Sequence, residues 1–247
     1  MSPRVITAVA ENAAAMEVFH IPFQSGNNEV LKRMGRGYTR EKYLAIVQRI
    51  RDEFGDGPAV SITADLIVGF PGAMFSQTST YPRKRNTHAS IRNTHSAIFG
   101  RSNDPTTGET EEQFQDTLSL LDEVKFDACM TAAYSPRPNT DAATWPDQVP
   151  EAVKQARLTA AKRLVDLHAE ARSSAFKGRV EEVLVERRNL KNPLEVMGRT
   201  RSNRQVFFRG DVDALKGSLV HVKINDCQPF FLSGEMVDSP TTSEDGR

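Results

Sequence analysis

The chain has 247 residues with 32 Lys and Arg against 32 Asp and Glu, so its formal net charge at pH 7 is +0. A neutral chain has no global field that attracts DNA or a membrane surface, and any basic contact surface must therefore be local. No apolar run approaches the length of a membrane span, and residues 1–18 lack the charged region and apolar core of a signal peptide. We expect an intracellular soluble protein of the cytoplasm or an organelle (mitochondrion or plastid), although the abrupt start also fits the loss of a targeting segment.

Cysteine usage excludes several kinds of metal site. Cys129 and Cys227 are the only two cysteines, and neither a CxxC nor a CxxxC spacing occurs. Iron–sulfur and structural zinc sites need closely spaced thiolates, so the chain's own thiols predict no metal site. Both cysteines are expected to be reduced, with Cys129 in a core strand.

The first two thirds of the chain alternate predicted strands and helices. Apolar runs followed by turn residues predict strands over residues 18–22, 59–68 and 126–134. Apolar stripes and capping residues predict helices over residues 29–34, from the N-cap Thr39 to Gly55, from the capping box of Thr110 and Gln113 to about residue 124, and from Pro150 to about residue 176.

This alternation is typical of parallel βα units and predicts an α/β fold. Loops at the carboxyl ends of parallel strands form the working face of such folds, which makes residues 20–28, 69–72 and 135–140 candidates for ligand contact. Three strands cannot close a barrel, and the chain starts almost directly on one. We therefore expect part of a larger sheet that lacks its N-terminal strands.

From about Gly178 the pattern changes to short β-branched or aromatic runs separated by turn residues. These runs predict a small all-β barrel with strands over residues 180–185, 195–200, 205–208, 218–224 and 230–236. Residues 239–247 are expected to form a disordered tail.

A basic stripe crosses this predicted barrel and includes the aromatic residues Phe207 and Phe208. Between positions 187 and 209 there is only one acidic residue, Glu195. The basic residues of the stripe are Arg187, Arg188, Lys191, Arg199, Arg201, Arg204 and Arg209. Basic and aromatic side chains together suit RNA backbone contact and base stacking. The alternative is a solvated hairpin with a buried phenylalanine.

Two motifs in the α/β part have polar groups where a ligand could bind. Gln24-Ser25-Gly26-Asn27 offers an amide, a hydroxyl and a flexible backbone that could hold a nucleoside-like ligand, and the alternative is a plain turn. Asp65 lies inside an apolar strand, where a carboxylate needs either a functional role or a neighbouring arginine. His20 is expected to be a packed, hydrogen-bonded histidine.

Five motifs in fixed order resemble a known family. They are His20-Ile21-Pro22-Phe23-Gln24-Ser25-Gly26-Asn27, Met34-Gly35-Arg36-Gly37-Tyr38-Thr39, Asp65-Leu66-Ile67-Val68-Gly69-Phe70-Pro71-Gly72, Tyr134-Ser135-Pro136-Arg137-Pro138, and Gly198-Arg199-Thr200 with Asn203-Arg204. The chain is similar to the radical SAM methylthiotransferase family, and most closely to the C-terminal part of its MiaB-type tRNA-2-methylthio-N6-isopentenyladenosine synthases. The resemblance implies a partial radical SAM (βα) barrel over residues 1–177 and a small all-β TRAM barrel, which binds RNA, over residues 178–238.

The family's function is tRNA modification. A complete enzyme carries two 4Fe-4S clusters, cleaves S-adenosyl-L-methionine with an electron donor, and methylthiolates N6-isopentenyladenosine at position 37, next to the tRNA anticodon. By resemblance, Gln24, Ser25, Gly26 and Asp65 would lie on the SAM side. The residues that would contact the tRNA anticodon loop are Arg199, Arg201, Asn203 and Arg204.

The sequence departs from the family in two ways. It has no CxxxCxxC motif and no N-terminal cluster domain, so we expect no catalytic residue in this chain and no reaction by this chain alone. The open alternatives are a non-catalytic RNA-binding module, or a different βα-barrel enzyme that binds a phosphate ligand.

The second departure is residues 73–108, which separate the Gly-Phe-Pro-Gly turn from the Glu-Thr-Glu sequence that follows it directly in the family. Removing them gives GFPGETEEQF and restores the family pattern. The segment is basic, rich in Ser and Thr and without periodicity, so it is expected to be disordered. A retained intron or gene-model error is the first explanation, and a genuine insertion that contacts tRNA is the second.

Overall fold

The computed structural model describes residues 2–72 and 108–238. The expectations for residues 73–107 and 239–247 fall outside the described residues. The helices are α1 (Pro3–Glu11), α2 (Asn28–Arg33), α3 (Arg40–Phe54), α4 (Glu111–Val124), α5 (Asp141–Thr144), α6 (Glu151–Ser174) and α7 (Val212–Leu215). The strands are β1 (Val18–His20), β2 (Ser61–Val68), β3 (Ala128–Ala133), β4 (Val180–Arg188), β5 (Glu195–Thr200), β6 (Gln205–Arg209), β7 (Leu219–Gln228) and β8 (Phe231–Val237).

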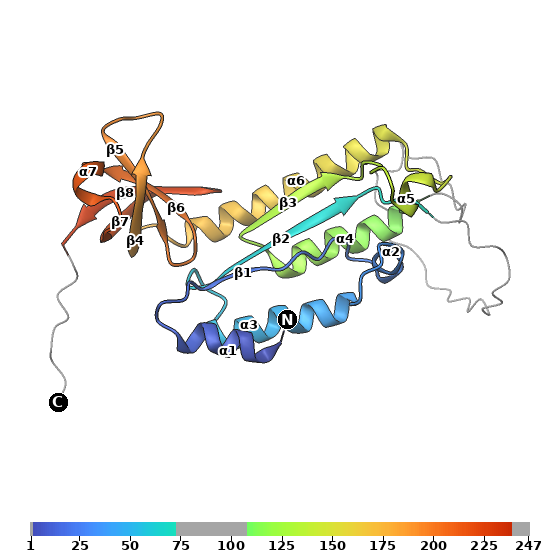
Figure 1. Cartoon of the computed structure of the whole chain (residues 1–247), viewed down its shortest axis with the longest axis horizontal. Helices are drawn as coiled ribbons and strands as arrows, with labels where there is room; N and C mark the ends of the chain where they lie inside the picture. Colours follow the sequence, from blue (N-terminus) through green and yellow to red (C-terminus); the bar gives the residue numbers. More distant parts are fainter. Residues whose placement is uncertain (1, 73–107, 239–247) are drawn as a thin grey trace, which may run out of the picture.

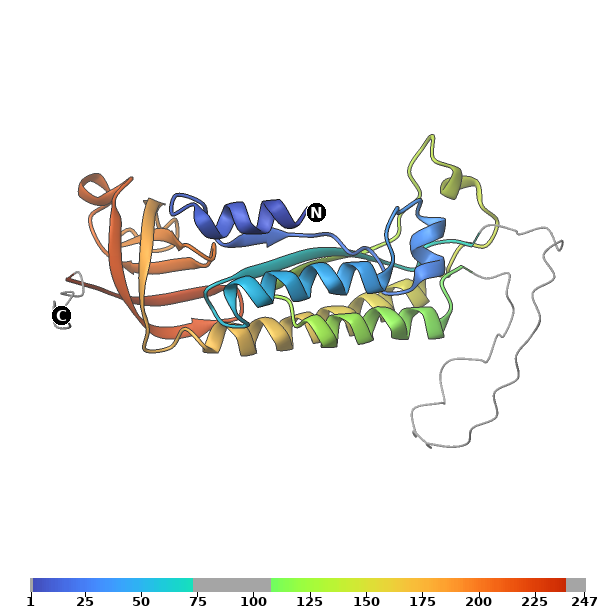
Figure 2. The same cartoon turned by 90° about the horizontal axis from the view of Figure 1, so that it is seen from below.

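The α/β part contains a parallel three-stranded sheet in the order β1-β2-β3. Helices α3, α4 and α6 lie together on one side of it (Figure 2). Side chains alternate along β2, so Ile62, Ala64, Leu66 and Val68 are buried while the residues between them are only partly buried. The predicted alternation of strands and helices is confirmed.

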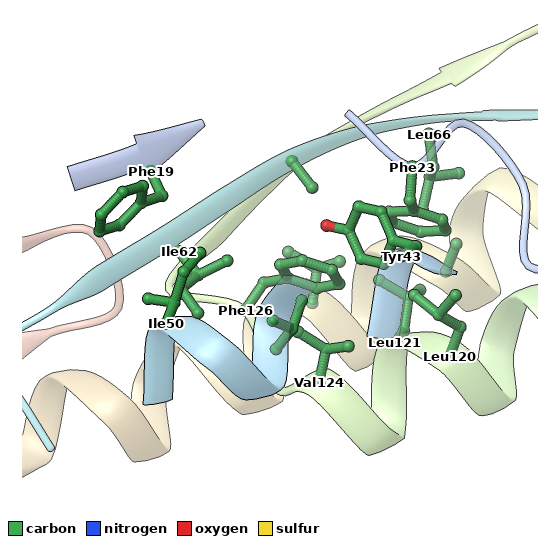
Figure 3. Close-up of a cluster of buried hydrophobic side chains, with 14 of the residues drawn as sticks. Phe19, Phe23, Tyr43, Ile50, Ile62, Leu66, Leu120, Leu121, Val124 and Phe126 are labelled. Atoms are coloured by element: carbon green, nitrogen blue, oxygen red, sulfur yellow. The ribbon is translucent and has the colours of Figure 1, made fainter. Parts of the chain in front are cut away.

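The core between the sheet and the helices is built around aromatic rings. Phe23 and Phe126 stack with ring centroids 5.4 Å apart and an interplanar angle of 5°, and Tyr43 packs beside both (Figure 3). Helix α3 contributes Tyr43, Val47 and Ile50 at helical spacing and is capped by the Thr39 hydroxyl, as predicted. The predicted Thr110–Gln113 capping box opens α4.

Helix α1, which the sequence did not predict, precedes β1. It begins at Pro3, whose fixed φ suits a first helical turn, and buries Ile6 against the core with Val9 packed beside it. The expectation that the chain starts almost directly on a strand is therefore wrong. The signal was weak because the larger apolar residues of this short stretch, Val5, Ile6 and Val9, are β-branched, and such residues also favour strands.

The C-terminal part is a closed barrel, as predicted, and its strands follow the order β4-β5-β6-β8-β7. Register shifts between Val185 and Arg187 and between Ile224 and Asp226 bend its two long strands. A Cβ at Gly234 would lie 2.1 Å from the Lys223 carbonyl oxygen, so only glycine allows β8 this close to β7. The core of the barrel consists of Phe176, Val183, Val185, Val196, Val206, Phe208, Val222, Ile224 and Leu232.

The barrel lies at the amino ends of β1, β2 and β3, and these strands point away from it (Figure 1). Helix α6 runs back along the sheet from the carboxyl ends of the strands to the barrel. Its 24 residues correspond to a length of about 36 Å. Among residues 2–72 and 108–238, no helix combines the length and apolarity needed to cross a membrane.

Candidate functional site

The Gln24-Ser25-Gly26-Asn27 turn is held against β2 by backbone hydrogen bonds. The Gln24 N–H donates to the Asp65 carbonyl at 2.9 Å, and the Ile67 N–H donates to the Gln24 carbonyl at 2.9 Å. Gln24 has φ 62°, a left-handed conformation that costs a non-glycine residue about 1–2 kcal/mol. The turn therefore occupies a fixed position beside the carboxyl half of β2.

Ser25 and Gly26 face α4 and are buried. The Ser25 hydroxyl lies 3.3 Å from the Thr117 hydroxyl, which also accepts the Gly26 N–H at 3.0 Å. A Cβ at Gly26 would lie 2.3 Å from the Asp116 carbonyl oxygen. These contacts explain both residue types by packing against α4, and Gln24 is also buried, with 7% of its surface exposed.

Asp65 lies on the other face of β2 beside His20. His20 Nε2 is 3.4 Å from Asp65 Oδ2, and His20 Nδ1 is 3.0 Å from the Thr63 hydroxyl. Asp65 Oδ1 is buried and has no hydrogen-bond partner among the residues that the structure describes. The alternative to a functional role was pairing with a neighbouring arginine, whereas the structure places a histidine beside Asp65, whose side chain is 35% exposed.

Residues 69–72 form the next carboxyl-end loop, and Glu109 completes it. The Glu109 N–H donates to the Phe70 carbonyl at 2.8 Å, and Glu109 Oε2 accepts the Gly69 N–H at 2.6 Å. The Gly72 and Gly108 N–H groups both donate to the Asp147 carbonyl, at 3.0 and 3.2 Å. The two ends of the interrupted connection therefore meet at one carbonyl oxygen.

Glu109 and Arg157 form a buried ion pair that the sequence analysis did not single out. The Arg157 guanidinium lies 3.3 Å from Glu109 Oε2 and donates to the Glu109 carbonyl at 2.7 Å, and Arg157 also lies over the Phe114 ring. Burial raises the pKa of the Glu109 carboxyl, and the Gly69 N–H and Arg157 only partly offset this effect. One signal in the sequence could have revealed this pair. Arg157 lies one helical turn before Ala161, on the apolar face of α6, where a charged residue is unexpected.

The TRAM residues predicted to contact RNA divide into two sets. Arg199 and Asn203 lie on the outside of the barrel, where Arg199 donates to Asn203 Oδ1 at 2.9 Å and pairs with Glu186 at 3.3 Å. Arg201 and Arg204 instead face the α/β part. Arg204 is 6% exposed and pairs with Asp127 at 2.7 Å, while Arg201 pairs with Glu17 at 2.6 Å. In this arrangement the Arg204 guanidinium is enclosed by protein and Asn203 is exposed, whereas the Arg199 and Arg201 side chains are 30% and 40% exposed.

The two phenylalanines of the basic stripe have different environments. Phe208 lies in the barrel core and is 2% exposed. The alternative interpretation of a solvated hairpin expected one buried phenylalanine of this kind. Phe207 is only half-buried and packs edge-to-face on Phe231, which is 42% exposed, with ring centroids 5.7 Å apart. An accessible aromatic pair therefore lies on the barrel surface, and Phe231 was not predicted because the sequence does not show that β6 and β8 are neighbours.

The described residues do not fit an iron–sulfur cluster. Cys129 packs against the core of the α/β part and Cys227 lies in β7 of the barrel, so the two thiols cannot share a metal. No group of three or more His, Cys, Asp or Glu residues in the described ranges has the geometry of a metal site. No reaction step through a cluster is assigned to this chain.

Comparison with known proteins finds a family match in each part of the chain. Residues 2–77 match the Radical SAM superfamily and residues 174–237 match the TRAM domain. Among solved structures, the chain is similar to coproporphyrinogen III oxidase (HemN) from Escherichia coli, a radical SAM enzyme, with 14% identity, a TM-score of 0.45 and 90% of this chain covered. The match covers 48% of that enzyme, so this chain spans about half its length. Part of a radical SAM α/β fold and a closed TRAM barrel are thus joined in one chain.

Proposed function

We propose that the chain acts in tRNA modification, as the RNA-binding part of a radical SAM enzyme that methylthiolates N6-isopentenyladenosine at position 37. The observation that carries this proposal is the presence of radical SAM and TRAM sequences in one chain, together with the ordered MiaB-type motifs. A complete enzyme would use SAM, 4Fe-4S clusters and an electron donor. The cluster ligands would have to come from outside this sequence.

The outer surface of the TRAM barrel supports contact with the tRNA anticodon loop. Arg199 of β5 and Asn203 offer donors to phosphate oxygens, and exposed Arg187, Arg188 and Arg209 add positive charge to the two strands that flank β5. The Phe207–Phe231 pair offers a ring face or edge on which an unpaired base can stack. This combination suits a single-stranded loop better than a regular duplex, because bases in a loop can leave the stack.

The α/β part supports a role on the SAM side of the same enzyme. The Asp65 side chain is 35% exposed, and Gln24 is held beside it by backbone hydrogen bonds. A carboxylate can accept hydrogen bonds from a ribose or an ammonium group. When bound, SAM would supply the radical and the methyl group, whereas these two residues would only orient it.

RNA binding can be tested directly by fluorescence anisotropy with a labelled tRNA anticodon arm at several salt concentrations. We expect affinity to fall with salt, Arg199→Ala to reduce the salt slope by about 1, and Phe207→Ala to cost about 1–3 kcal/mol per stacked base. Arg163→Ala, on the exposed side of α6, is the matched control. RNA binding that is absent or independent of salt would overturn the RNA-binding part of the proposal.

A second candidate function, a non-catalytic RNA-binding module, is favoured by the lack of clustered thiols. The two candidates differ in their dependence on the isopentenyl group and on SAM. The methylthiolation role predicts tighter binding of an anticodon arm that carries N6-isopentenyladenosine, and SAM binding that is weakened by Asp65→Ala. Equal affinity for modified and unmodified RNA, with no heat of SAM binding in calorimetry, would support the module and refute the enzyme role.

A further inference from the structure

The loop between β5 and β6, residues 200–204, is held in one conformation by its own hydrogen bonds. The Thr200 hydroxyl accepts the Arg204 N–H at 3.1 Å and contacts the Ser202 hydroxyl at 3.1 Å. Asn203 is left-handed with φ 63°, and its N–H donates to the Thr200 carbonyl. The loop therefore presents its two arginines, Arg201 and Arg204, in fixed directions toward the α/β part.

Arg204 is anchored by groups from both parts of the molecule. Its guanidinium lies 2.7 Å from Asp127 Oδ1 of the α/β part, and the two side chains are 6% and 5% exposed. It also donates to the Pro229 carbonyl at 2.9 Å and lies over the Phe176 ring. Asp127 is itself fixed, because its Oδ2 accepts the Ile62 N–H of β2 at 2.9 Å.

Asp127 also holds the end of α6 that enters the barrel. Arg172 Nε lies 2.9 Å from Asp127 Oδ1, and the Arg172 guanidinium lies 3.1 Å from Asp56 Oδ1. Burial alone would lower the pKa of Arg172, but the charges of Asp127 and Asp56 raise it. A single carboxylate at the amino end of β3 thus joins the sheet, α6 and the barrel.

Arg201 makes a second attachment at the amino end of β1. It lies 2.6 Å from Glu17 Oε1 and donates to the carbonyls of Ala13 and Ala15, at 3.0 and 2.6 Å. The hydrogen bond to Glu17 raises the pKa of Arg201. The two attachments lie at the starts of different strands, β1 and β3, and two separated points resist rotation where one would not.

We propose that Arg201 and Arg204 are a two-point clamp that fixes the TRAM barrel against the amino ends of the sheet. They are positioning residues and do not contact RNA. Residues 199–204 then serve two purposes, since Arg199 and Asn203 face outward while Arg201 and Arg204 face the α/β part. The clamp sets where an RNA held by the outer surface stands relative to the carboxyl ends of the strands.

The acceptor side of the clamp allows a test that leaves every TRAM arginine in place. We would compare the parent chain with the Glu17→Gln/Asp127→Asn double variant by 15N relaxation, using amides of β2 and β7 as reporters. We expect one tumbling time for both sets in the parent and faster tumbling of the β7 set in the variant. Glu123→Gln, which removes a carboxylate paired with Arg40 inside the α/β part, is the matched control and should keep one tumbling time.

The donor side separates a clamp from an RNA contact. Arg201→Lys/Arg204→Lys keeps both charges but loses the planar forks that bridge several acceptors. The clamp predicts separate tumbling of the two parts and unchanged affinity for a short single-stranded RNA. A common tumbling time in both double variants would overturn the clamp, as would an affinity for short RNA that falls with the lysine variants and not with the acceptor variants. The tumbling readout needs no RNA, so failure of the proposed function would not be mistaken for failure of the clamp.

Discussion

The two parts of the molecule complete their sheets in different ways. The TRAM barrel closes on itself, and the ring of strands leaves no edge among β4 to β8. The α/β sheet has two edges and helices on one side, and Met130 on its other face is 76% exposed. Among the described residues, the barrel therefore contains its whole core, whereas the α/β part keeps one face of its sheet accessible.

In both parts, the residues that form the core are separate from the residues that could contact a ligand. Every strand of the barrel contributes to one enclosed cluster, so its surface is free to carry basic and aromatic side chains. In the α/β part the helix side carries the cluster around Phe23 and Phe126, while His20, Thr63 and Asp65 occupy the accessible face. Polar groups on a sheet face are expected where that face contacts a ligand or another element.

The largest predicted effect is core truncation, which tests whether the two parts unfold separately. Phe23→Ala should cost about 3–5 kcal/mol, because it removes a fully buried ring from the α/β core, and Phe208→Ala should cost a similar amount in the barrel. Trp145, the single tryptophan, reports on the α/β part. Urea unfolding followed by tryptophan fluorescence should shift with Phe23→Ala and not with Phe208→Ala if the parts are independent, and with both if the junction couples them.

A smaller effect concerns the buried Glu109, which should make the stability of the α/β part depend on pH. Its folded-state pKa is raised by burial, so its contribution to stability is fully present below the unfolded pKa of about 4.3 and is lost as pH rises through the folded pKa. Glu109→Gln should remove this loss of stability with rising pH. The unfolding free energy of the variant, relative to that of the parent, should therefore increase between pH 4 and 7.

The control for this pH series is Glu111→Gln, which removes a half-exposed carboxylate 3.4 Å from the same arginine. It should change stability by at most about 1 kcal/mol. A constant difference between Glu109→Gln and the parent across the pH range would contradict the role of burial.

Each part of the molecule carries one cysteine, so the rates at which the two thiols are alkylated can be compared between the parts. Burial, together with the charge of Asp65, raises the pKa of the Cys129 thiol to about 12, so at pH 8 roughly 10⁻⁴ of it is thiolate. Burial and Asp226 also raise the pKa of Cys227, which is the less buried of the two. Iodoacetamide labelling followed by peptide mass spectrometry should therefore modify Cys227 first, and faster labelling of Cys129 would mean that the sheet opens more readily than the barrel.

The smallest effect is expected from deleting residues 73–108. Phe70, Pro71, Gly72 and Glu109 would then be consecutive, with proline and glycine at the two central positions of a β-turn. The hydrogen bond that closes such a turn, from the Glu109 N–H to the Phe70 carbonyl, is already present. We expect the deletion to change stability by no more than about 0.5 kcal/mol, measured by urea unfolding, and a loss of the folded state would show that the segment is required.

Local signals in the sequence predicted most of the elements. The Thr110–Gln113 capping box, the apolar stripe of α3 and the barrel strands depend on neighbours within a few residues, and all are present. The contacts of Arg204 with Asp127 and of Phe207 with Phe231 join residues far apart in the chain. Neither pair could be predicted from the sequence. A charged or aromatic residue is equally compatible with an exposed contact surface, with a junction between two parts and with a packed pair.

Helix α6 acts as a lever between the two parts. Over its length of about 36 Å, a tilt of about 10° at the junction displaces the far end by about 6 Å. Reacting groups that are misplaced by about 1 Å lose much of their rate, and that distance corresponds to a tilt of only about 2°. If the proposed function holds, the tolerance for rotation at Asp127 and Glu17 is therefore narrow, because a small rotation there would move an RNA held by the barrel relative to the carboxyl ends of the strands.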